Sequence, residues 1–366
     1  DPGLDRIYLS YVDSHVEVFS GADLSRDGIV QLDADAIAVN ADIKTHRLFV
    51  VSPGATVLTM YAVEPRGKPV VERIAGVDRY EGSAKVSAAR FAPMTGTAYV
   101  ASGEGFADAL SASAAAGADG GPVLLVQKNV VPLSIIAELR RLKPQRIVIV
   151  GGPLTVSEDV EKELGRFSAS VSRVTGTDRF DVSANLSRGV FKSGKAVAYV
   201  ASGLVFPDAL SGSAAAGKNG SPVLLVQPDA VPTSVELELK RLAPAQIVVL
   251  GGRNTVSDPV LTQLNRIAPT SRTSGADRFD GSAAISAANF PAENPLVFVA
   301  SGAVFPDALS GSAAAIAAGS PVLLVSKDTM AASIDRELDR LLPSKIIVLG
   351  GTGTISDAVL TALRDH

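Results

Sequence analysis

The side chains that could recognise a ligand recur three times along the chain as an Asp-Arg pair followed by an aromatic residue. The pairs are Asp78-Arg79, Asp178-Arg179 and Asp277-Arg278. The planar guanidinium group of arginine suits phosphate and carboxylate groups, and ligands of α/β proteins usually lie where a strand ends and a helix begins. The pairs therefore indicate recognition of an anion. The alternative is that each aspartate only caps a helix and each arginine pairs with a neighbouring acid.

A Ser-Gly turn and a further aspartate follow each pair in the same order. The turns are Ser102-Gly103, Ser202-Gly203 and Ser301-Gly302, and the aspartates are Asp108, Asp208 and Asp307. Backbone N–H groups at such a turn can bind an anion. The aspartates begin stretches rich in Ala, Ser and Gly, where a helix macrodipole alone favours a negative charge. We treat all these residues as candidate ligand-binding residues, with a structural role for the aspartates as the alternative.

Residues suited to catalysis are scarce. The chain has no cysteine, and its only histidines are His15, His46 and His366, outside the recurring pattern. Neither a recurring nucleophile–histidine set nor a histidine metal site is therefore possible. No dinucleotide or Walker loop follows the Gly-Gly steps. An acid pair such as Asp178 with Asp208 could act in catalysis, but nothing singles it out. We predict a protein without enzymatic activity, metal or cofactor.

Three units of about equal length must position these residues, because the aspartates at 108, 208 and 307 are spaced by one domain-sized period. Within each unit, uninterrupted apolar strands alternate with helices, as in 222–226, 233–242 and 247–250 of the middle unit. This alternation favours a parallel sheet covered on both faces. The predicted fold class is α/β, with three tandem flavodoxin-like or Toprim-like modules in a pseudo-three-fold arrangement.

The expected boundaries follow from this period. Residues 69–170, 171–269 and 270–366 form the three repeats, joined without linkers. Residues 1–68 are a β-rich segment whose short runs are punctuated by Asp, Gly, Ser and Asn. The order of these runs resembles a blade of a YVTN-type β-propeller, so the segment is interpreted as part of a larger β domain or as a set of strands that packs on the neighbouring unit.

Other recurring residues have plainer interpretations. Pro-Val-Leu-Leu is expected to be a core strand rather than a ligand contact. The glutamate–arginine pairs three residues apart are predicted to be surface ion pairs; they are Glu138/Arg141, Glu238/Arg241 and Glu337/Arg340.

Composition limits the partner. The formal net charge of −4 argues against general nucleic-acid binding. No apolar run is long enough to span a membrane. With 5% aromatic residues and no tryptophan, stacking on neutral sugars is not favoured. An anionic partner would instead require Arg79, Arg179 and Arg278 to be clustered.

The complete pattern resembles the cell-wall-binding repeat 2 family. The resemblance rests on Arg-x-x-Gly-x-Asp-Arg-[Phe/Tyr], then Phe-x-Asp-Ala-Leu-Ser-x-Ser, then Pro-Val-Leu-Leu, then an apolar strand ending in Gly-Gly. Valine stands in Pro-Val-Leu-Leu where the family has isoleucine. The three copies cover residues 71–366.

The resemblance implies a secreted protein of the cell surface, held non-covalently to the wall of Gram-positive bacteria. Three tandem copies form a trimer-like ring within one chain, so a monomer with an internal pseudo-trimer is expected. The implied partner is an anionic wall polymer, either teichoic-acid-like or an acidic polysaccharide, and residues 1–65 belong to the cargo. The alternatives are a self-assembling surface-layer or adhesion protein and, less favoured, a wall-active hydrolase.

Overall fold

The computed structural model describes residues 68–366 in full and, before them, six strands without their side chains. These strands form two antiparallel sheets, β1-β2-β3 and β4-β5-β6. Their bounds are β1 Arg6–Tyr11, β2 His15–Ser20, β3 Arg26–Gln31, β4 Ala38–Asp42, β5 Arg47–Val51 and β6 Thr59–Ala62. The β-rich character of the segment is therefore present, whereas its likeness to a propeller blade stays a prediction.

Three four-stranded parallel sheets form the rest of the molecule. The first has the order β11-β10-β8-β9, the second β13-β12-β14-β15 and the third β17-β16-β18-β7. The strand bounds are β7 Val70–Ile74, β8 Thr97–Ser102, β9 Val123–Val126, β10 Arg146–Val150, β11 Ser170–Val174, β12 Val197–Ser202, β13 Val223–Val226, β14 Gln246–Leu250, β15 Thr270–Thr273, β16 Leu296–Ser301, β17 Val322–Val325 and β18 Lys345–Leu349. The predicted α/β class and three repeated modules are confirmed.

The first strand of each repeat lies in the sheet of the preceding repeat. Strand β11 begins the second repeat but pairs with β10 of the first. Strand β15 likewise pairs with β14. The first strand of the first repeat, β7, pairs with β18, the last strand of the third repeat, from Val70 opposite Lys345 to Ile74 opposite Leu349. The expected boundaries therefore mark repeats of sequence rather than separate sheets, and the exchange of strands closes a ring.

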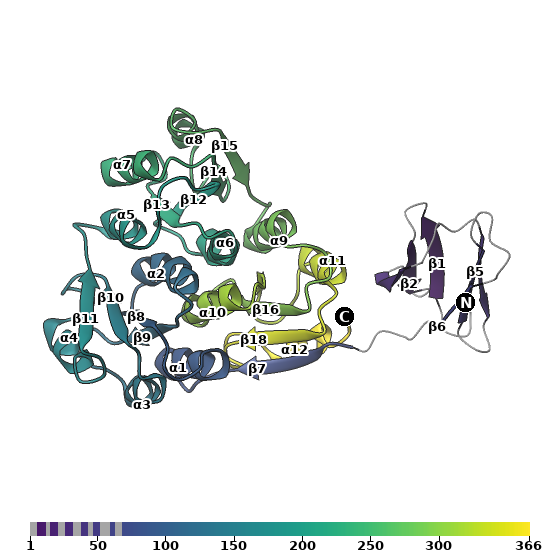
Figure 1. The fold of residues 1–366 in the computed structure, drawn as a ribbon, viewed down its shortest axis with the longest axis horizontal. Coiled ribbons are helices and arrows are strands. Elements are labelled where there is room, and N and C mark those ends of the chain that lie inside the picture. Colours follow the sequence, from purple (N-terminus) through teal and green to yellow (C-terminus); the bar gives the residue numbers. More distant parts are fainter. Residues whose placement is uncertain are drawn as a thin grey trace.

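Three helices rich in small residues pack on one another at the centre of this ring (Figure 1). They are α2 Ala107–Ala118, α6 Pro207–Lys218 and α10 Pro306–Ala317. Hydroxyl groups join them, because Ser113 Oγ donates to Leu309 O at 2.9 Å and Ser312 Oγ donates to Leu210 O at 3.3 Å. Small side chains allow this close approach, which produces the predicted three-fold arrangement.

The remaining helices cover the sheets. The first helix of each repeat packs on the central helix of the preceding repeat, as α5 does on α2, α9 on α6 and α1 on α10. These helices are α1 Arg79–Arg90, α5 Arg179–Val190 and α9 Arg278–Asn289. The others are α3 Leu133–Leu142, α4 Glu158–Leu164, α7 Thr233–Leu242, α8 Asp258–Leu264, α11 Ala332–Leu341 and α12 Asp357–Leu363.

The glutamate–arginine pairs are not surface ion pairs, and that prediction is wrong. The side chains of Glu138, Glu238 and Glu337 are 5%, 0% and 5% exposed. In the first repeat, Arg141 binds both carboxylate oxygens of Glu138, and Ser87 Oγ donates to the same group at 2.5 Å. A buried carboxylate needs such partners. Sequence spacing could not reveal the burial, which comes from the packing of α3 on α1.

The Pro-Val-Leu-Leu strands are core, as expected. Residues Val123–Val126 of β9 are buried, and β9 is an edge strand of its sheet. Its Leu125 N–H donates to Ser83 Oγ at 3.1 Å, and the same bond recurs in the other two repeats. A serine of the covering helix thus satisfies an amide that would otherwise be an unpaired edge group.

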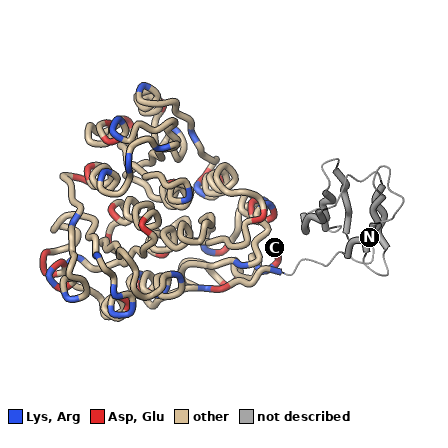
Figure 2. Tube along the Cα trace, in the orientation of Figure 1, with Lys and Arg blue, Asp and Glu red and all other residues tan. Residues whose placement is uncertain are grey.

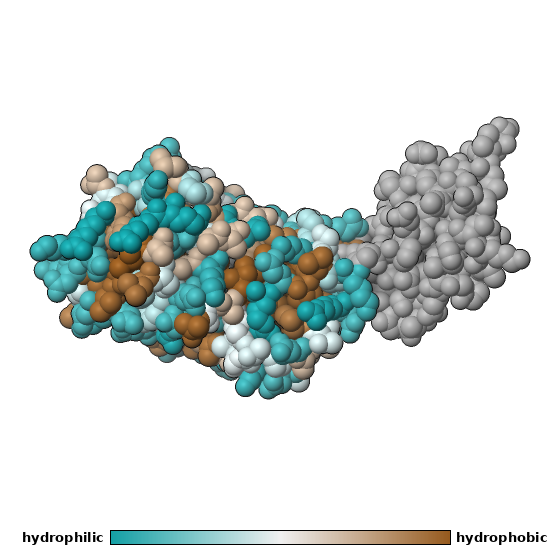
Figure 3. Space-filling model, turned by 90° about the horizontal axis from the view of Figure 1, so that it is seen from below, coloured by the Kyte–Doolittle hydropathy of each residue, from teal (hydrophilic) through white to brown (hydrophobic). Residues whose placement is uncertain are grey.

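Charged residues are interspersed on the outer helices, whereas the central helices carry few (Figure 2). On the side of the ring that Figure 3 shows, hydrophobic residues lie in separate patches with hydrophilic residues between them. Among the helices of residues 68–366, none is both long and apolar enough to cross a membrane.

Candidate functional site

The three Asp-Arg arginines hold equivalent positions, each at a boundary between two repeats. Arg79, Arg179 and Arg278 are exposed. Each Nη1 donates to the carbonyl oxygen of the Ser-Gly turn in its own repeat, at 2.5 Å to Gly103, 2.7 Å to Gly203 and 2.5 Å to Gly302. The rest of each guanidinium group faces the central helix of the preceding repeat. The site is therefore completed by two repeats rather than by one.

The aspartates of these pairs are helix caps. Asp178 Oδ1 accepts hydrogen bonds from the N–H groups of Phe180 and Asp181, both at 2.9 Å, and Asp78 and Asp277 do the same in their repeats. Capping fixes the start of the helix. The geometry accordingly matches the structural alternative for aspartate, while the adjacent arginine is held at the mouth of the site.

The Ser-Gly turns do not offer free amides at their glycines, so this part of the anion-binding expectation is wrong. The N–H groups of Gly103, Gly203 and Gly302 donate to the carbonyl oxygens of Val126, Val226 and Val325. The serine hydroxyls instead accept from the amides that follow, as Ser202 Oγ does from Leu204 N at 3.2 Å. The turns position the arginines through their carbonyl oxygens.

Glycine is required at these turns because a side chain would displace the arginine. A Cβ atom on Gly203 would lie 2.6 Å from the ring of Phe180 and 3.3 Å from Arg179 Cδ. The other two turns are equally crowded by their own arginine and aromatic residue. The aromatic residue after each Asp-Arg pair thus packs over the turn and supports the arginine stem.

A triad of phenylalanine rings occupies the centre of the site. Phe106, Phe206 and Phe305 precede the three central helices, and their ring centroids are 5.7 to 5.9 Å apart. The Arg179 guanidinium carbon lies 5.7 Å from the centre of the Phe106 ring, and that of Arg79 lies 5.8 Å from the Phe305 ring. These are cation–π distances. Two of the three arginines therefore lie against the aromatic triad, whereas the third, Arg278, faces Asp208 at the start of α6.

The second set of aspartates, Asp108, Asp208 and Asp307, lies beside these arginines in half-buried positions. Burial raises the pKa of Asp108, while a hydrogen bond from Thr155 and the Arg179 charge partly oppose that shift. Burial likewise raises the pKa of Asp208 and of Asp307, opposed by the charges of Arg278 and Arg79. Each aspartate is thus faced by the arginine of the following repeat. The acid pair Asp178 with Asp208 stays a conceivable one only, and the cavity that includes Asp178 also includes Asp108 of the preceding repeat.

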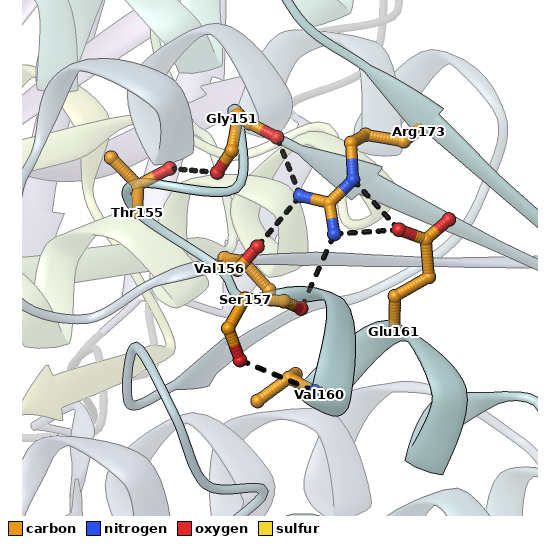
Figure 4. Close-up of polar contacts among 8 residues, drawn as sticks. Gly151, Thr155, Val156, Ser157, Val160, Glu161 and Arg173 are labelled. Atoms are coloured by element: carbon orange, nitrogen blue, oxygen red, sulfur yellow. Dashed lines mark hydrogen bonds and ion pairs between the residues drawn. The ribbon is translucent and has the colours of Figure 1, made fainter.

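A separate set of arginines fixes the loops around the site. Arg173 on β11 donates to the carbonyl oxygens of Gly151 and Val156, at 2.9 and 2.8 Å, and binds Glu161 on α4 (Figure 4). Gly151 has φ +114°, and a Cβ there would lie 2.5 Å from Asp108 Oδ2. Arg73 makes the matching bonds to Gly350 and Ile355 across the ring closure. These arginines are structural because their guanidinium groups are already bonded to the protein.

Cavities lie at two of these repeat boundaries, at the carboxyl ends of the strands. The cavity between the first and second repeats has a volume of about 370 Å³ and includes Asp108, Asp178 and Arg179. The cavity between the third and first repeats measures about 570 Å³ and includes Asp78, Arg79 and Asp307. Both contain at least one ring of the phenylalanine triad. Within residues 68–366, no group of three or more His, Cys, Asp or Glu side chains could hold a metal ion.

Sequence reasoning missed the aromatic triad and the threonines, Thr155 among them, that face the half-buried aspartates. Phe106, Phe206 and Phe305 recur at one position, which was a usable signal for a shared role. Their meeting at one point, however, depends on the three-fold assembly. Of the residues expected at the site, the structure brings Arg79, Arg179 and Arg278 together with Asp108, Asp208 and Asp307. The helix-capping aspartates and the Ser-Gly turns instead fix the positions of these arginines.

These features define a class of protein: a closed ring of three α/β repeats that carries equivalent exposed arginines at its repeat boundaries. Within that class the chain belongs to the Cell wall binding domain 2 family, which it matches over residues 73–161, 173–261 and 272–360. The match spans more than half of the chain and confirms the expected family and its three tandem copies.

Relatives share this part of the chain. The N-acetylmuramoyl-L-alanine amidase LytC of Bacillus subtilis is 24% identical over 81% of this chain, and the amidase enhancer of the same organism is 28% identical over 84%. The chain covers only 58% and 42% of their lengths. Cwp6 and Cwp8 from Clostridium difficile share the fold, with TM-scores of 0.75 and 0.73 over 96% and 87% of this chain. Their sequence identities are 21% and 22%, and the chain covers 57% and 58% of these structures.

Proposed function

We propose that this chain anchors a secreted protein to the cell wall of Gram-positive bacteria by binding an anionic wall polymer at the ends of its central helices. The observation that carries the proposal is the ring of exposed arginines, Arg79, Arg179 and Arg278, around the phenylalanine triad. The N-termini of α2, α6 and α10 lie at the same place, and helix N-termini favour negative charge.

The half-buried aspartates Asp108, Asp208 and Asp307 face the three arginines one for one, and a capping aspartate precedes each arginine, so the site carries no net positive charge. In this proposal the exposed part of each guanidinium group, rather than net charge, binds the spaced phosphate or carboxylate groups of a polymer. Repetition of the site suits a polymer, because a repeated ligand can occupy equivalent positions in succession. A teichoic-acid-like polymer and an acidic polysaccharide both have this character.

In this proposal the chain is a binding module without catalysis of its own. Two relatives are named as an amidase and an amidase enhancer, and they extend well beyond the matched part. Any further activity of the whole protein would reside outside the ring. The ring works as a monomer, because strand exchange within one chain already supplies all three boundaries.

Co-sedimentation with protein-free Gram-positive walls tests the proposal, before and after chemical removal of the anionic polymers and at two salt concentrations. Binding should disappear with the polymers and weaken with salt. The variant R79Q/R179Q/R278Q should not sediment. The control R140Q/R166Q/R364Q has the same change in charge at exposed positions elsewhere and should bind as the native protein does.

Equal binding to both kinds of wall, or equal losses in the two arginine variants, would contradict the proposal. Ordered arrays of the purified chain in electron microscopy, without wall binding, would favour self-assembly into a surface layer instead.

A further inference from the structure

The opposite end of the central helices carries a second basic cavity. Its volume is about 550 Å³, and its lining includes Lys192, Lys195 and Lys218. Lys192 and Lys195 precede strand β12, and Lys218 ends helix α6, so the cavity lies at the amino ends of the strands. A helix of twelve residues is about 18 Å long, which separates this cavity from the arginine ring.

Departure from the three-fold pattern distinguishes this cavity. The lysines occur only in the second repeat, whereas the matching positions of the other repeats hold uncharged residues. Those positions are Ala92 and Pro291 for Lys192, Thr95 and Asn294 for Lys195, and Ala118 and Ala317 for Lys218. The fold therefore does not need the lysines, since two of its three copies form without them.

The floor of the cavity is also built from unequal residues. Gly117 and Gly217 of the first two repeats face Ile316 of the third, and a Cβ on either glycine would lie within 2.5 Å of the isoleucine side chain. One isoleucine thus fills the space at the axis that two glycines leave. Phe191 also lines the cavity, and its ring centre is 5.4 Å from Lys195 Nζ.

No acid within the cavity balances the lysines. The one carboxylate in the lining, Asp119, is already bound by Tyr99 Oη at 2.8 Å and Arg146 Nη2 at 2.9 Å. Lys218 Nζ donates to the carbonyl oxygen of Asn289 at 2.5 Å and lies 4.7 Å from the centre of the Phe290 ring. Burial lowers the pKa of Lys218, and no neighbouring acid offsets that effect.

The helix C-termini do not account for the lysines either. Basic residues often complement the negative end of a helix, but here the last carbonyl groups have backbone donors. Gly220 N–H donates to Gly217 O and Ser221 N–H to Ala216 O, and α2 and α10 close in the same way. The lining of the cavity therefore holds three lysines and no acid that balances them, while the Lys218 ammonium group already has a carbonyl acceptor.

We propose that this cavity is a second anion-binding site, present once per ring, that takes a phosphate group. Lysine ammonium groups bind phosphate as point charges, and the lining of this open cavity includes three lysines and one carboxylate that is already bonded. The site lies on the face where the chain enters the ring at Lys68, ahead of β7. It is independent of the arginine ring and does not require that the polymer bind there.

Titration calorimetry with tripolyphosphate tests this inference in the R79Q/R179Q/R278Q background, which removes the arginine ring as a competing site. Further substitution of the lysines, as K192Q/K195Q/K218Q, should weaken binding by about tenfold or more. The charge-matched control K85Q/K162Q/K240Q changes exposed lysines elsewhere and should leave binding unchanged. The variant K192R/K195R/K218R keeps the charge and should retain binding.

Anion binding should also raise the pKa of Lys218, measured by NMR of its ammonium group. Equal binding with and without the three lysines, or equal losses in the control, would overturn the inference. Sedimentation with phosphatidylglycerol vesicles and with intact walls then identifies the carrier of the phosphate: lysine-dependent loss with vesicles assigns it to a lipid headgroup, and loss with walls to the polymer.

Discussion

Individual side chains in this ring divide sharply between those already bonded to the protein and those open to a ligand. The guanidinium groups of Arg173 and Arg141 donate hydrogen bonds to backbone carbonyl oxygens, and that of Arg141 also to the buried Glu138. Arg179 uses one nitrogen to fix its position and remains exposed. The same residue type thus has two roles, and only the surroundings distinguish them.

Replacement of Arg141 by methionine should destabilise the protein strongly. The change leaves the buried Glu138 carboxylate without its cation, which costs about 3 kcal/mol in the free energy of unfolding. The pKa of Arg141 is raised by its hydrogen bond to Glu138, in keeping with a strong pair. Urea denaturation measures the effect. The adjacent, exposed Arg140→Met is the control and should change stability by about 0.5 kcal/mol or less; equal effects of the two variants would mean that the pair contributes little.

Asp208 should make the stability depend on pH. Burial raises its pKa in the folded protein, so the stabilising contribution of its protonated form is present below about pH 4 and is lost as pH rises through the raised value. Asp208→Asn removes this dependence. Its free energy of unfolding relative to the native protein should therefore increase from pH 4 to pH 7, measured by urea denaturation at each pH. The exposed Asp229→Asn is the control variant, and a flat difference for Asp208→Asn would contradict the pKa argument.

At the scale of elements, each arginine that we propose to bind the polymer depends on a turn and a helix start that belong to its own repeat. The capping aspartate sets where the helix begins, and the glycine carbonyl holds the guanidinium group. The partner aspartate and phenylalanine come from the central helix of the preceding repeat. A change in the turn should therefore alter binding while the sheets remain intact.

Gly203→Ala tests this dependence. The added Cβ would lie 2.6 Å from the Phe180 ring and 3.3 Å from Arg179 Cδ, so the ring and Arg179 must shift away from the turn. We expect weaker sedimentation with walls and only a modest loss of stability. Gly189→Ala on α5 is the matched control, because nothing lies within 4 Å of its added Cβ. Unchanged wall binding of Gly203→Ala would show that the position of Arg179 is unimportant.

Much of this architecture could be predicted from the sequence, and the exceptions have a common cause. The strand expected at 247–250 is present as β14, Gln246–Leu250, because its local pattern is clear. The pairing of β11 with β10 of the preceding repeat was not foreseen, since periodicity within a segment contains no information about its partner. Glu138 resembled a surface residue for the same reason. The candidate arginines could be found because they recur in the sequence. The phenylalanine triad could not, because its three rings meet only when the three repeats assemble.

The whole molecule is closed by one strand, because β7 near the start of the ring completes the sheet of the last repeat. Arg73 reinforces the closure through Gly350, Ile355 and Asp357. Without β7, strand β18 would become an open edge, which invites pairing with another chain.

Truncation tests this closure. A chain of residues 76–366 lacks β7 and should self-associate with rising concentration, because β18 is left unpaired. A chain of residues 68–366 keeps β7 and should remain monomeric. Light scattering coupled to size-exclusion chromatography distinguishes the two states. Monomers of equal thermal stability in both cases would show that β7 does not secure the ring.

The position of this closing strand also determines how an anchored protein would resist mechanical load. The chain enters at the amino end of β7, whereas the arginine ring lies at the carboxyl ends of the strands. Tension between cargo and wall would pull β7 along its own axis against its parallel neighbour β18. The hydrogen bonds between the two strands would then be loaded together in shear rather than opened one at a time. A protein anchored in this way would therefore resist the force produced by flow or by growth of the wall.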